Sequence, residues 1–163
     1  MDAPVSPDPR AAYDAVASVY DDLTAHHDHE LWLALLLELA GEHGLAGTRA
    51  LDVACGTGKS FMPLVRRGFD VTACDISPRM AARARRRARG HGVCVHVADM
   101  RRLPRLCEGA DLVTCLDDAV NYLLGDEDLA RALGSMARLL RPGGLLTFDL
   151  NSLSAHREGF AAT

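Results

Sequence analysis

The chain has 163 residues, of which 48% are hydrophobic and 25% are charged, a composition typical of one globular domain. Its formal net charge of −4 gives no overall attraction to nucleic acid or to an anionic membrane surface. The five cysteines are odd in number and have no C-x-x-C spacing, so they predict buried, reduced thiols rather than a disulfide framework or a zinc site.

The beginning of the chain predicts a cytoplasmic protein with a helical cap. Residues 1–9 are acidic and proline-rich, without the basic and apolar segments of a signal peptide, and we predict a disordered tail there. The apolar run at residues 31–37 is too short to span a bilayer. Helical spacing of apolar residues then predicts an N-terminal helical cap over residues 10–45, followed by a core over residues 46–163.

The cap is expected to contain two helices. The first covers about residues 10–24, and the second begins near Asp28 and ends at Gly41 or Gly44. The apolar residues of the second helix are expected to form one stripe: Leu31, Trp32, Leu35, Leu36 and Leu39.

After the cap, predicted strands and helices alternate. Five strands are expected at residues 49–54, 69–75, 93–98, 110–116 and 144–150. Helices are expected at residues 58–67, 77–89 and 126–140, the second of them with Ser77 as its N-cap. Strands separated by single helices predict a parallel sheet with right-handed crossovers, in which ligands bind outside the carboxyl ends of the strands.

The stretch DVACGTGKS, residues 52–60, follows the first predicted strand and resembles three kinds of nucleotide-binding loop. A Walker A loop requires glycine at the position of Val53, and a dinucleotide fingerprint requires glycine at the position of Phe61. Gly56 and Gly58 still let the backbone approach a ligand, and a helix N-terminus behind them favours an anion. The loop therefore suits a nucleoside with a small acidic end better than one with a pyrophosphate.

Carboxylates follow the next two strands. Asp75 ends the second strand, where it could accept hydrogen bonds from both ribose hydroxyls, and Asp99 follows the third, where it could accept one from an adenine amine. Asp52 lies inside the buried first strand, where an unpaired charge is costly. It either accepts hydrogen bonds near the ligand or has a purely structural role.

Five segments, LDVACGTG, VTACDIS, VADMRRLP, DLVTCLDDAVNYL and LLRPGGLLTFDLN, occur in the order and spacing of class I S-adenosylmethionine (SAM)-dependent methyltransferases. Over about residues 10–155 the chain resembles the small-molecule branch of that family. The resemblance implies a Rossmann-like three-layer α/β/α sandwich, mostly parallel, with strand order 3-2-1-4-5. Family members add an antiparallel strand pair after the fifth strand. This pair is expected to be lacking here, which would leave the fifth strand as an uncovered edge available for a homodimer.

The resemblance also implies a set of residues that bind SAM: Tyr13, Tyr20, Asp52, Ala54, Gly56, Gly58, Asp75, Ile76, Met80, Asp99, Met100, Leu116 and Asp117. In this reading the backbones of Ala54 and Gly56 line the methionine end of the cofactor, and a tyrosine covers it. Asp75 holds the ribose, Ile76 packs on the adenine, and Asp117 lies by the amino group and the sulfonium.

The implied reaction is direct in-line transfer of the methyl group to a nitrogen or oxygen atom of a small-molecule acceptor. Asp118 is a candidate for orienting or deprotonating that acceptor. The stretch DDAV that contains it differs from the Asn-Pro-Pro-Tyr type motif of methyltransferases that act on planar amide or base nitrogens. Two alternatives stay open, a non-catalytic SAM-binding module and an NAD(P)-dependent oxidoreductase, and Phe61 disfavours the second.

Three further features have a structural interpretation. Lys59 could meet the cofactor carboxylate or point to solvent. The six arginines of residues 79–89 are expected to form a solvated helix face rather than a nucleic-acid surface, because no aromatic residues interleave with them. In the stretch HHDHE, residues 26–30, His26 and Glu30 are four apart on a helix and could hold a metal, but a polar helix start is favoured and no metal site is predicted.

Overall fold

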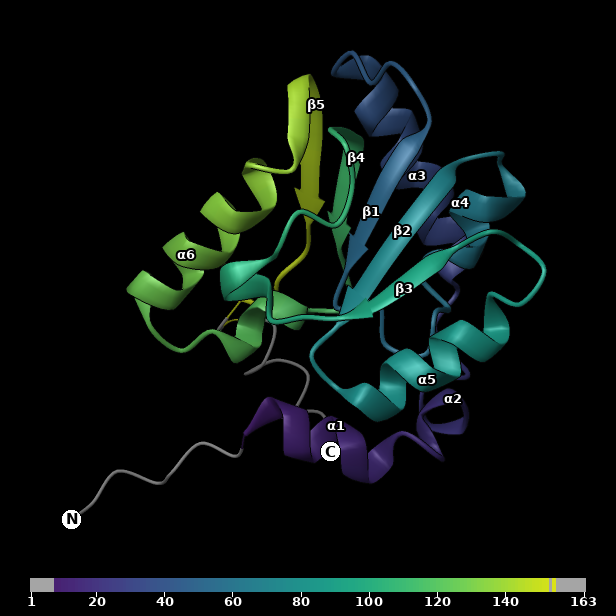
Figure 1. Cartoon of the computed structure of the whole chain (residues 1–163), viewed down its shortest axis with the longest axis vertical. Coiled ribbons are helices and arrows are strands. Elements are labelled where there is room, and N and C mark those ends of the chain that lie inside the picture. The colour runs from purple at the N-terminus through teal and green to yellow at the C-terminus, as the bar shows by residue number, and fades with distance from the viewer. Residues whose placement is uncertain (1–7, 153, 155–163) are drawn as a thin grey trace.

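A computed structural model of the chain describes residues 8–152 and 154. Its centre is a five-stranded, all-parallel sheet with the order β3-β2-β1-β4-β5, as predicted (Figure 1). The strands are β1 (Arg49–Val53), β2 (Asp70–Asp75), β3 (Cys94–Val97), β4 (Ala110–Cys115) and β5 (Leu140–Phe148). The helices are α1 (Pro9–Val16), α2 (Tyr20–Leu23), α3 (His29–Glu42), α4 (Met62–Arg66), α5 (Pro78–Arg87), α6 (Asp126–Ala137) and the short 3-10 helices η1 (Met100–Arg102) and η2 (Ala119–Tyr122).

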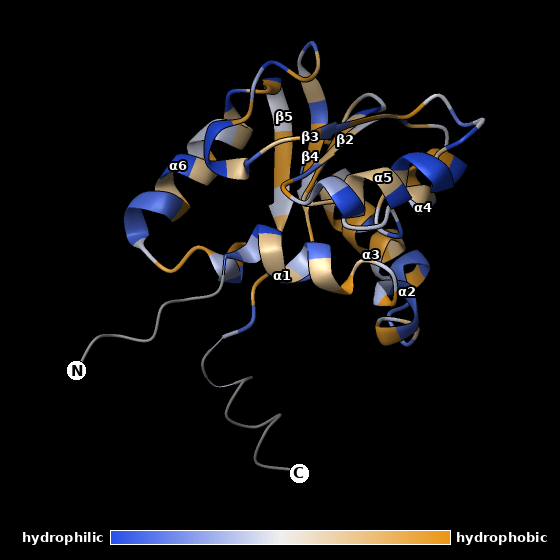
Figure 2. Cartoon of the chain, turned by 60° about the horizontal axis from the view of Figure 1, so that its bottom comes forward, coloured by the Kyte–Doolittle hydropathy of each residue, from blue (hydrophilic) through white to orange (hydrophobic). Residues whose placement is uncertain are grey.

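Helices cover both faces of the sheet and make the predicted three layers. Successive strand residues point to opposite faces, so Ala50 packs with α3, α4 and α5, whereas Leu51 packs with α6. Hydrophobic residues gather in the strands between the two layers, and α5 and α6 carry hydrophilic segments (Figure 2). Within the described residues, no helix has the length and apolar character needed to span a membrane.

Helix α5 follows its sequence prediction closely. The Ser77 hydroxyl accepts a hydrogen bond from the Met80 amide at 3.0 Å and caps the helix, and Pro78 occupies the first position. The small apolar residues Ala81 and Ala84 are buried against the sheet together with Met80, so the arginines face outward or pair with acidic groups.

The helix predicted for residues 10–24 is divided into α1 and α2. The chain turns at residues 17–19, after which Asp21 accepts hydrogen bonds from Thr57 at 2.5 Å and from Arg87 at 2.7 Å. These contacts tie α2 to the loop after β1 and to the end of α5. Most of the tail predicted for residues 1–9 lies outside the described residues, but Asp8 caps α1 by accepting from the Arg10 amide.

The predicted apolar stripe of α3 is wrong for four of its five residues, and Leu36 alone among the five packs against the core. Leu31, Leu35 and Leu39 are 60%, 57% and 56% exposed, whereas Leu33 and Ala40 are buried. Apolar residues surround this helix on nearly all sides, so hydrophobic spacing alone does not define which face meets the sheet.

Three smaller differences concern element boundaries and cysteines. Strand β5 begins at Leu140 rather than at residue 144, with a register irregularity against β4, and α4 is shorter than predicted. Cys55, Cys74 and Cys115 are buried free thiols as expected, but Cys94 is exposed and Cys107 is half-buried. In the described part of the chain β5 forms one edge of the sheet, and a homodimer through this edge stays a prediction.

Candidate functional site

Two adjoining cavities lie at the carboxyl ends of the strands, at the end of the molecule where α1 sits (Figure 1). Their volumes are about 240 Å³ and about 70 Å³, and below they are called the larger and the smaller cavity. Ala54, Ile76, Met100 and Tyr122 line both, so the two cavities adjoin, and together they are called the crevice below. The strand order reverses here, because the chain runs from β1 to β2 and β3 on one side and then returns to β4 and β5 on the other. Ligands of open α/β sheets bind at this topological switch point.

The backbone is turned sharply where β1 and β4 end. Ala54, Asp117 and Asp118 have φ angles of 58°, 58° and 50°, and they are the non-glycine residues with positive φ in the described chain. Such conformations cost about 1–3 kcal/mol each and cluster at functional sites. Gly56, with φ of 52°, continues the turn after β1 beneath the ring of Tyr20.

Asp75, the last residue of β2, is fixed in the wall of the smaller cavity. Its two carboxylate oxygens accept hydrogen bonds from the amides of Gly56 and Ser77, both at 2.8 Å. Burial raises the pKa of this carboxyl, and the two backbone hydrogen bonds oppose that rise. The remaining acceptor capacity of both oxygens is available to ligand hydroxyls.

Asp52 lies beneath the crevice rather than in its wall. It is 1% exposed and accepts hydrogen bonds from the hydroxyls of Ser60 and Thr114, both at 2.6 Å. Burial raises the pKa of Asp52 to about 6, and the two hydroxyl donors limit the rise. Because Ser60 lines the smaller cavity, Asp52 positions a wall residue without touching the cavity itself.

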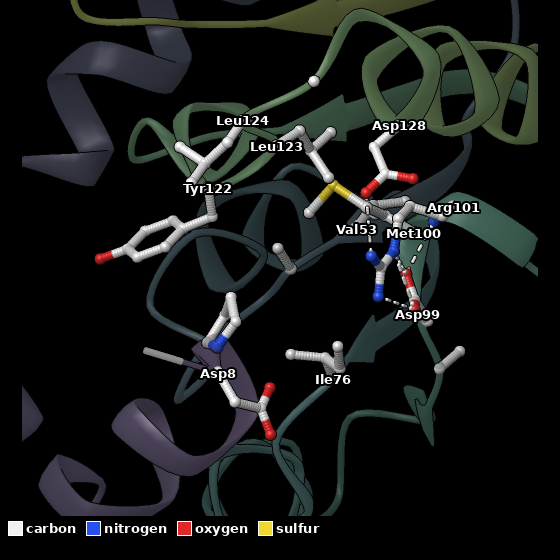
Figure 3. Close-up of a pocket in the computed structure, with 14 residues that line it drawn as sticks. Asp8, Val53, Ile76, Asp99, Met100, Arg101, Tyr122, Leu123, Leu124 and Asp128 are labelled. Atoms are coloured by element: carbon white, nitrogen blue, oxygen red, sulfur yellow. Dashed lines mark hydrogen bonds and ion pairs between the residues drawn. The ribbon is translucent and has the colours of Figure 1, made fainter. Parts of the chain in front are cut away.

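The larger cavity has mostly apolar walls, with Asp99, Arg101 and Asp128 gathered on one side and Asp8 apart from them (Figure 3). Asp99 caps η1, and its carboxylate accepts from the Arg101 guanidinium at 2.7 Å, which lowers the pKa of Asp99. Arg101 also donates to Asp128 of α6 at 3.0 Å. The carboxylate predicted to receive an adenine amine is therefore already held by a neighbouring guanidinium, while Ile76, Met100 and Leu123 offer apolar surface for a flat ring.

Three tyrosines lie at the smaller cavity. The Tyr13 hydroxyl donates to the Tyr122 hydroxyl at 2.9 Å, and the Tyr13 ring packs edge-on against Tyr20 with centroids 5.9 Å apart. Burial is the main cause that raises the pKa of Tyr13 and of Tyr20, so both stay neutral donors at physiological pH.

His29 was not predicted as a wall residue, but the structure places it there. Its Nε2 atom lies 2.8 Å from Oδ2 of Asp117, although 88 positions separate the two residues in sequence. The polar stretch at residues 26–30 was the one feature of the sequence that pointed to His29, and nothing in the sequence indicated that Asp117 would be its partner. Lys59 also lines the smaller cavity, where its ammonium donates to the Thr24 carbonyl at 2.6 Å.

The structure brings most of the predicted cofactor residues together in the crevice walls: Tyr13, Tyr20, Ala54, Gly56, Asp75, Ile76, Asp99, Met100 and Asp117. It does not bring the others there: Asp52, Gly58, Met80, Leu116 and the candidate base Asp118. Met80 and Leu116 are buried, and a Cβ on Gly58 would lie 2.6 Å from the Phe61 ring, so this glycine makes room for Phe61. Asp118 is held at its amide by Asp149 and at its carboxylate by Asn151.

A parallel sheet of this order, with a glycine-bearing turn after β1 and a buried carboxylate ending β2, defines a Rossmann-like nucleoside-binding domain. Residues 50–144 match the family described as "Methyltransferase domain". The chain belongs to this family, within the class I SAM-dependent methyltransferases.

Individual relatives agree with the family. The chain is 33% identical over 141 residues to the putative methyltransferase YqeM of Bacillus subtilis, covering 86% of this chain and 56% of that protein. It is 35% identical over 153 residues to the ubiquinone biosynthesis O-methyltransferase of Sodalis glossinidius, covering 89% and 59%. The sugar N-methyltransferase KedS8 from Streptoalloteichus superposes with a TM-score of 0.72 at 29% identity, covering 93% and 58%. The chain thus spans less than two thirds of each of these relatives.

Proposed function

We propose that this protein transfers the methyl group of SAM to a nitrogen or oxygen atom of a small-molecule acceptor. The observation that best supports this proposal is the crevice, in which the buried carboxylate of Asp75 and the turn at Gly56 lie beside the larger, mostly apolar cavity. Relatives named as a sugar N-methyltransferase and a ubiquinone O-methyltransferase support both kinds of acceptor atom.

The residues present fit the cofactor. The larger, mostly apolar cavity would hold the adenine, to which Ile76 and Met100 would offer apolar surface. Asp75 would accept from the ribose hydroxyls, because its oxygens are fixed by two amides and still have acceptor capacity. Asp117, beside the smaller cavity, would face the amino group of the methionine portion.

When bound, SAM supplies a methyl group activated by a sulfonium, so the chain's residues chiefly need to orient the acceptor and exclude water. Holding two reactants in line can lower a barrier by about 7–11 kcal/mol. Tyr13, Tyr20 and Tyr122 would cover the reacting end, with neutral hydroxyls as donors. Asp118 as a general base stays a prediction, since its carboxylate is engaged with Asn151.

Calorimetric titration with SAM and S-adenosylhomocysteine, on the wild type and on Asp75→Ala, tests the cofactor site. Losing charged hydrogen bonds to the ribose should weaken binding by about 2–4 kcal/mol. Asp70→Ala is the matched control, because Asp70 is exposed at the opposite end of the same strand. Circular dichroism verifies that each variant is folded, and equal affinity in folded Asp75→Ala would refute the assignment.

A second experiment separates catalysis from binding. We expect transfer of radiolabelled methyl groups to amine or hydroxyl acceptors, in this chain or in a form extended at its C-terminus. Tight SAM binding without transfer in either form would favour the alternative of a non-catalytic SAM-binding module.

A further inference from the structure

Two histidines and one carboxylate converge at the edge of the smaller cavity. His27 precedes α3, His29 is its first residue, and Asp117 follows β4. One ligand atom from each of these side chains lies within 4.8 Å of the other two. We call these three residues the histidine–aspartate cluster.

The contacts inside the cluster leave acceptor capacity unused. Nε2 of His29 lies 2.8 Å from Oδ2 of Asp117, whereas Nδ1 of His27 lies 3.7 Å from Oδ1, beyond hydrogen-bond distance. Oδ1 of Asp117 is a buried oxygen without a hydrogen-bond partner among the described residues. Buried polar atoms without a partner are uncommon in native proteins, and an unplaced ion is one of the recognised explanations.

Two further carboxylates belong to this part of the site. Asp118 follows Asp117 in the chain, and Asp149 accepts a hydrogen bond from the Asp118 amide at 2.8 Å. Lys59, the cation lining the same cavity, is turned toward the carbonyl and hydroxyl of Thr24, 2.6 Å and 3.1 Å from its ammonium. The local charge therefore favours an added cation beside Asp117.

We propose that His27, His29 and Asp117 bind a divalent first-row transition-metal ion such as Zn²⁺ or Co²⁺. Two imidazoles and one carboxylate are a donor set that suits these ions better than Mg²⁺ or Ca²⁺, which prefer oxygen ligands alone. A shared ion would lie about 2.0–2.2 Å from each of the three donor atoms, which lie within 4.8 Å of one another.

The cluster lies between two open spaces. His29 and Asp117 line the smaller cavity, and both histidines line a separate groove between the start of α3 and α4. Three protein ligands leave coordination positions for water or for an oxygen or nitrogen atom of an acceptor. This role in acceptor binding rests on the proposed methyl transfer, whereas metal binding itself does not.

The test uses Co²⁺ alone as the probe, with the chain first stripped of metal by a chelator. We expect one Co²⁺ per chain and visible ligand-field absorption from a nitrogen- and oxygen-bound ion. The double variant His27→Ala/His29→Ala should bind Co²⁺ more than about 100-fold more weakly, beyond the 10–100-fold loss that removal of an outer-shell partner causes.

Two further variants make the result specific. Asp117→Asn should weaken Co²⁺ binding at least about tenfold, and asparagine tolerates the left-handed backbone found at this position. His43→Ala is the matched control, because His43 is exposed at the far end of α3, and it should bind Co²⁺ like the wild type. Circular dichroism monitors folding in every case.

Similar Co²⁺ affinity in the wild type and the double variant would overturn the proposal, as would loss of binding in His43→Ala. Because the proposed function also places Asp117 beside the amino group of the cofactor, Co²⁺ is titrated into the SAM-free chain and SAM into the metal-free chain. SAM binding without Co²⁺ binding refutes only the metal site, and Co²⁺ binding without SAM binding refutes only the proposed methyl transfer.

Discussion

Replacing Asp52 by asparagine should change how stability depends on pH. In the folded protein burial raises the pKa of Asp52 to about 6, above the ordinary value of 3.8. Between these two values the unfolded chain loses a proton that the folded chain retains. The contribution of Asp52 to stability is therefore fully present below about pH 3.8 and is lost as the pH rises through about 6.

The size of the effect follows from the shift. About 2 pKa units at 1.36 kcal/mol each give a loss of about 3 kcal/mol between pH 3.5 and pH 7. Asparagine does not titrate and has nearly the same shape, so the Asp52→Asn protein should lack this part of the pH dependence. Relative to the wild type, the variant should gain up to about 3 kcal/mol in unfolding free energy across this range.

Urea unfolding of both proteins at pH 4, 5, 6 and 7 measures the difference, because other titrating groups largely cancel in it. Thr114→Val provides a directional check, since it removes one hydroxyl that donates to Asp52 and should move the loss to higher pH. A stability difference between Asp52→Asn and wild type that stays flat, or that falls with rising pH, would refute this reasoning.

Two pairs of substitutions test the packing. Gly58→Ala should destabilise the protein by about 1–3 kcal/mol more than Gly68→Ala. Both glycines have a similar positive φ, but of the two only Gly58 has a neighbour that an added Cβ would meet, the ring of Phe61. Equal losses of unfolding free energy in thermal or urea unfolding would contradict this contact. Leu33→Ala should cost about 2–5 kcal/mol, whereas Leu35→Ala, at 57% exposure, should stay within about 0.5 kcal/mol. Similar costs in urea unfolding would show that α3 meets the sheet with another face.

The sheet could be predicted from the sequence because each of its strands is a short apolar run between turn signals. Strands separated by single helices leave few topologies, and the five ordered segments of the family resemblance reduce these to one. The strand ends follow from the same pattern, which is why Ala54, Gly56 and Asp75 lie at the crevice as predicted.

The cap was harder to predict, for a physical reason. In α3, leucines and a tryptophan occupy almost every direction around the helix, so burial of Leu33 rather than Leu35 is decided by the neighbouring elements. The break between α1 and α2 depends in the same way on contacts of Asp21 with Thr57 and Arg87, which are distant in sequence.

Site residues could be predicted where their position at a strand end places them at the crevice. They could not be predicted where the site depends on contacts between side chains that are far apart in sequence. The pairing of His29 with Asp117 and the bridge from Asp99 through Arg101 to Asp128 join separate segments of the chain. Met80 shows the opposite error, because a residue close to the crevice in sequence is directed by helix geometry into the core.

Helix α1 is attached to the rest of the molecule differently from the strands of the sheet. None of the helix's own residues is buried, and it is held by polar contacts such as those from Tyr13 to Tyr122 and from Ser77 to Asp14. Lifting it would break a few hydrogen bonds of about 0.5–1.5 kcal/mol each and the edge-on contacts of the Tyr13 ring with Tyr20 and Tyr122. One wall of the crevice, which Pro9 and Tyr13 line, thus belongs to a helix attached at the surface, whereas the neighbouring strands are held by the hydrogen bonds of the sheet.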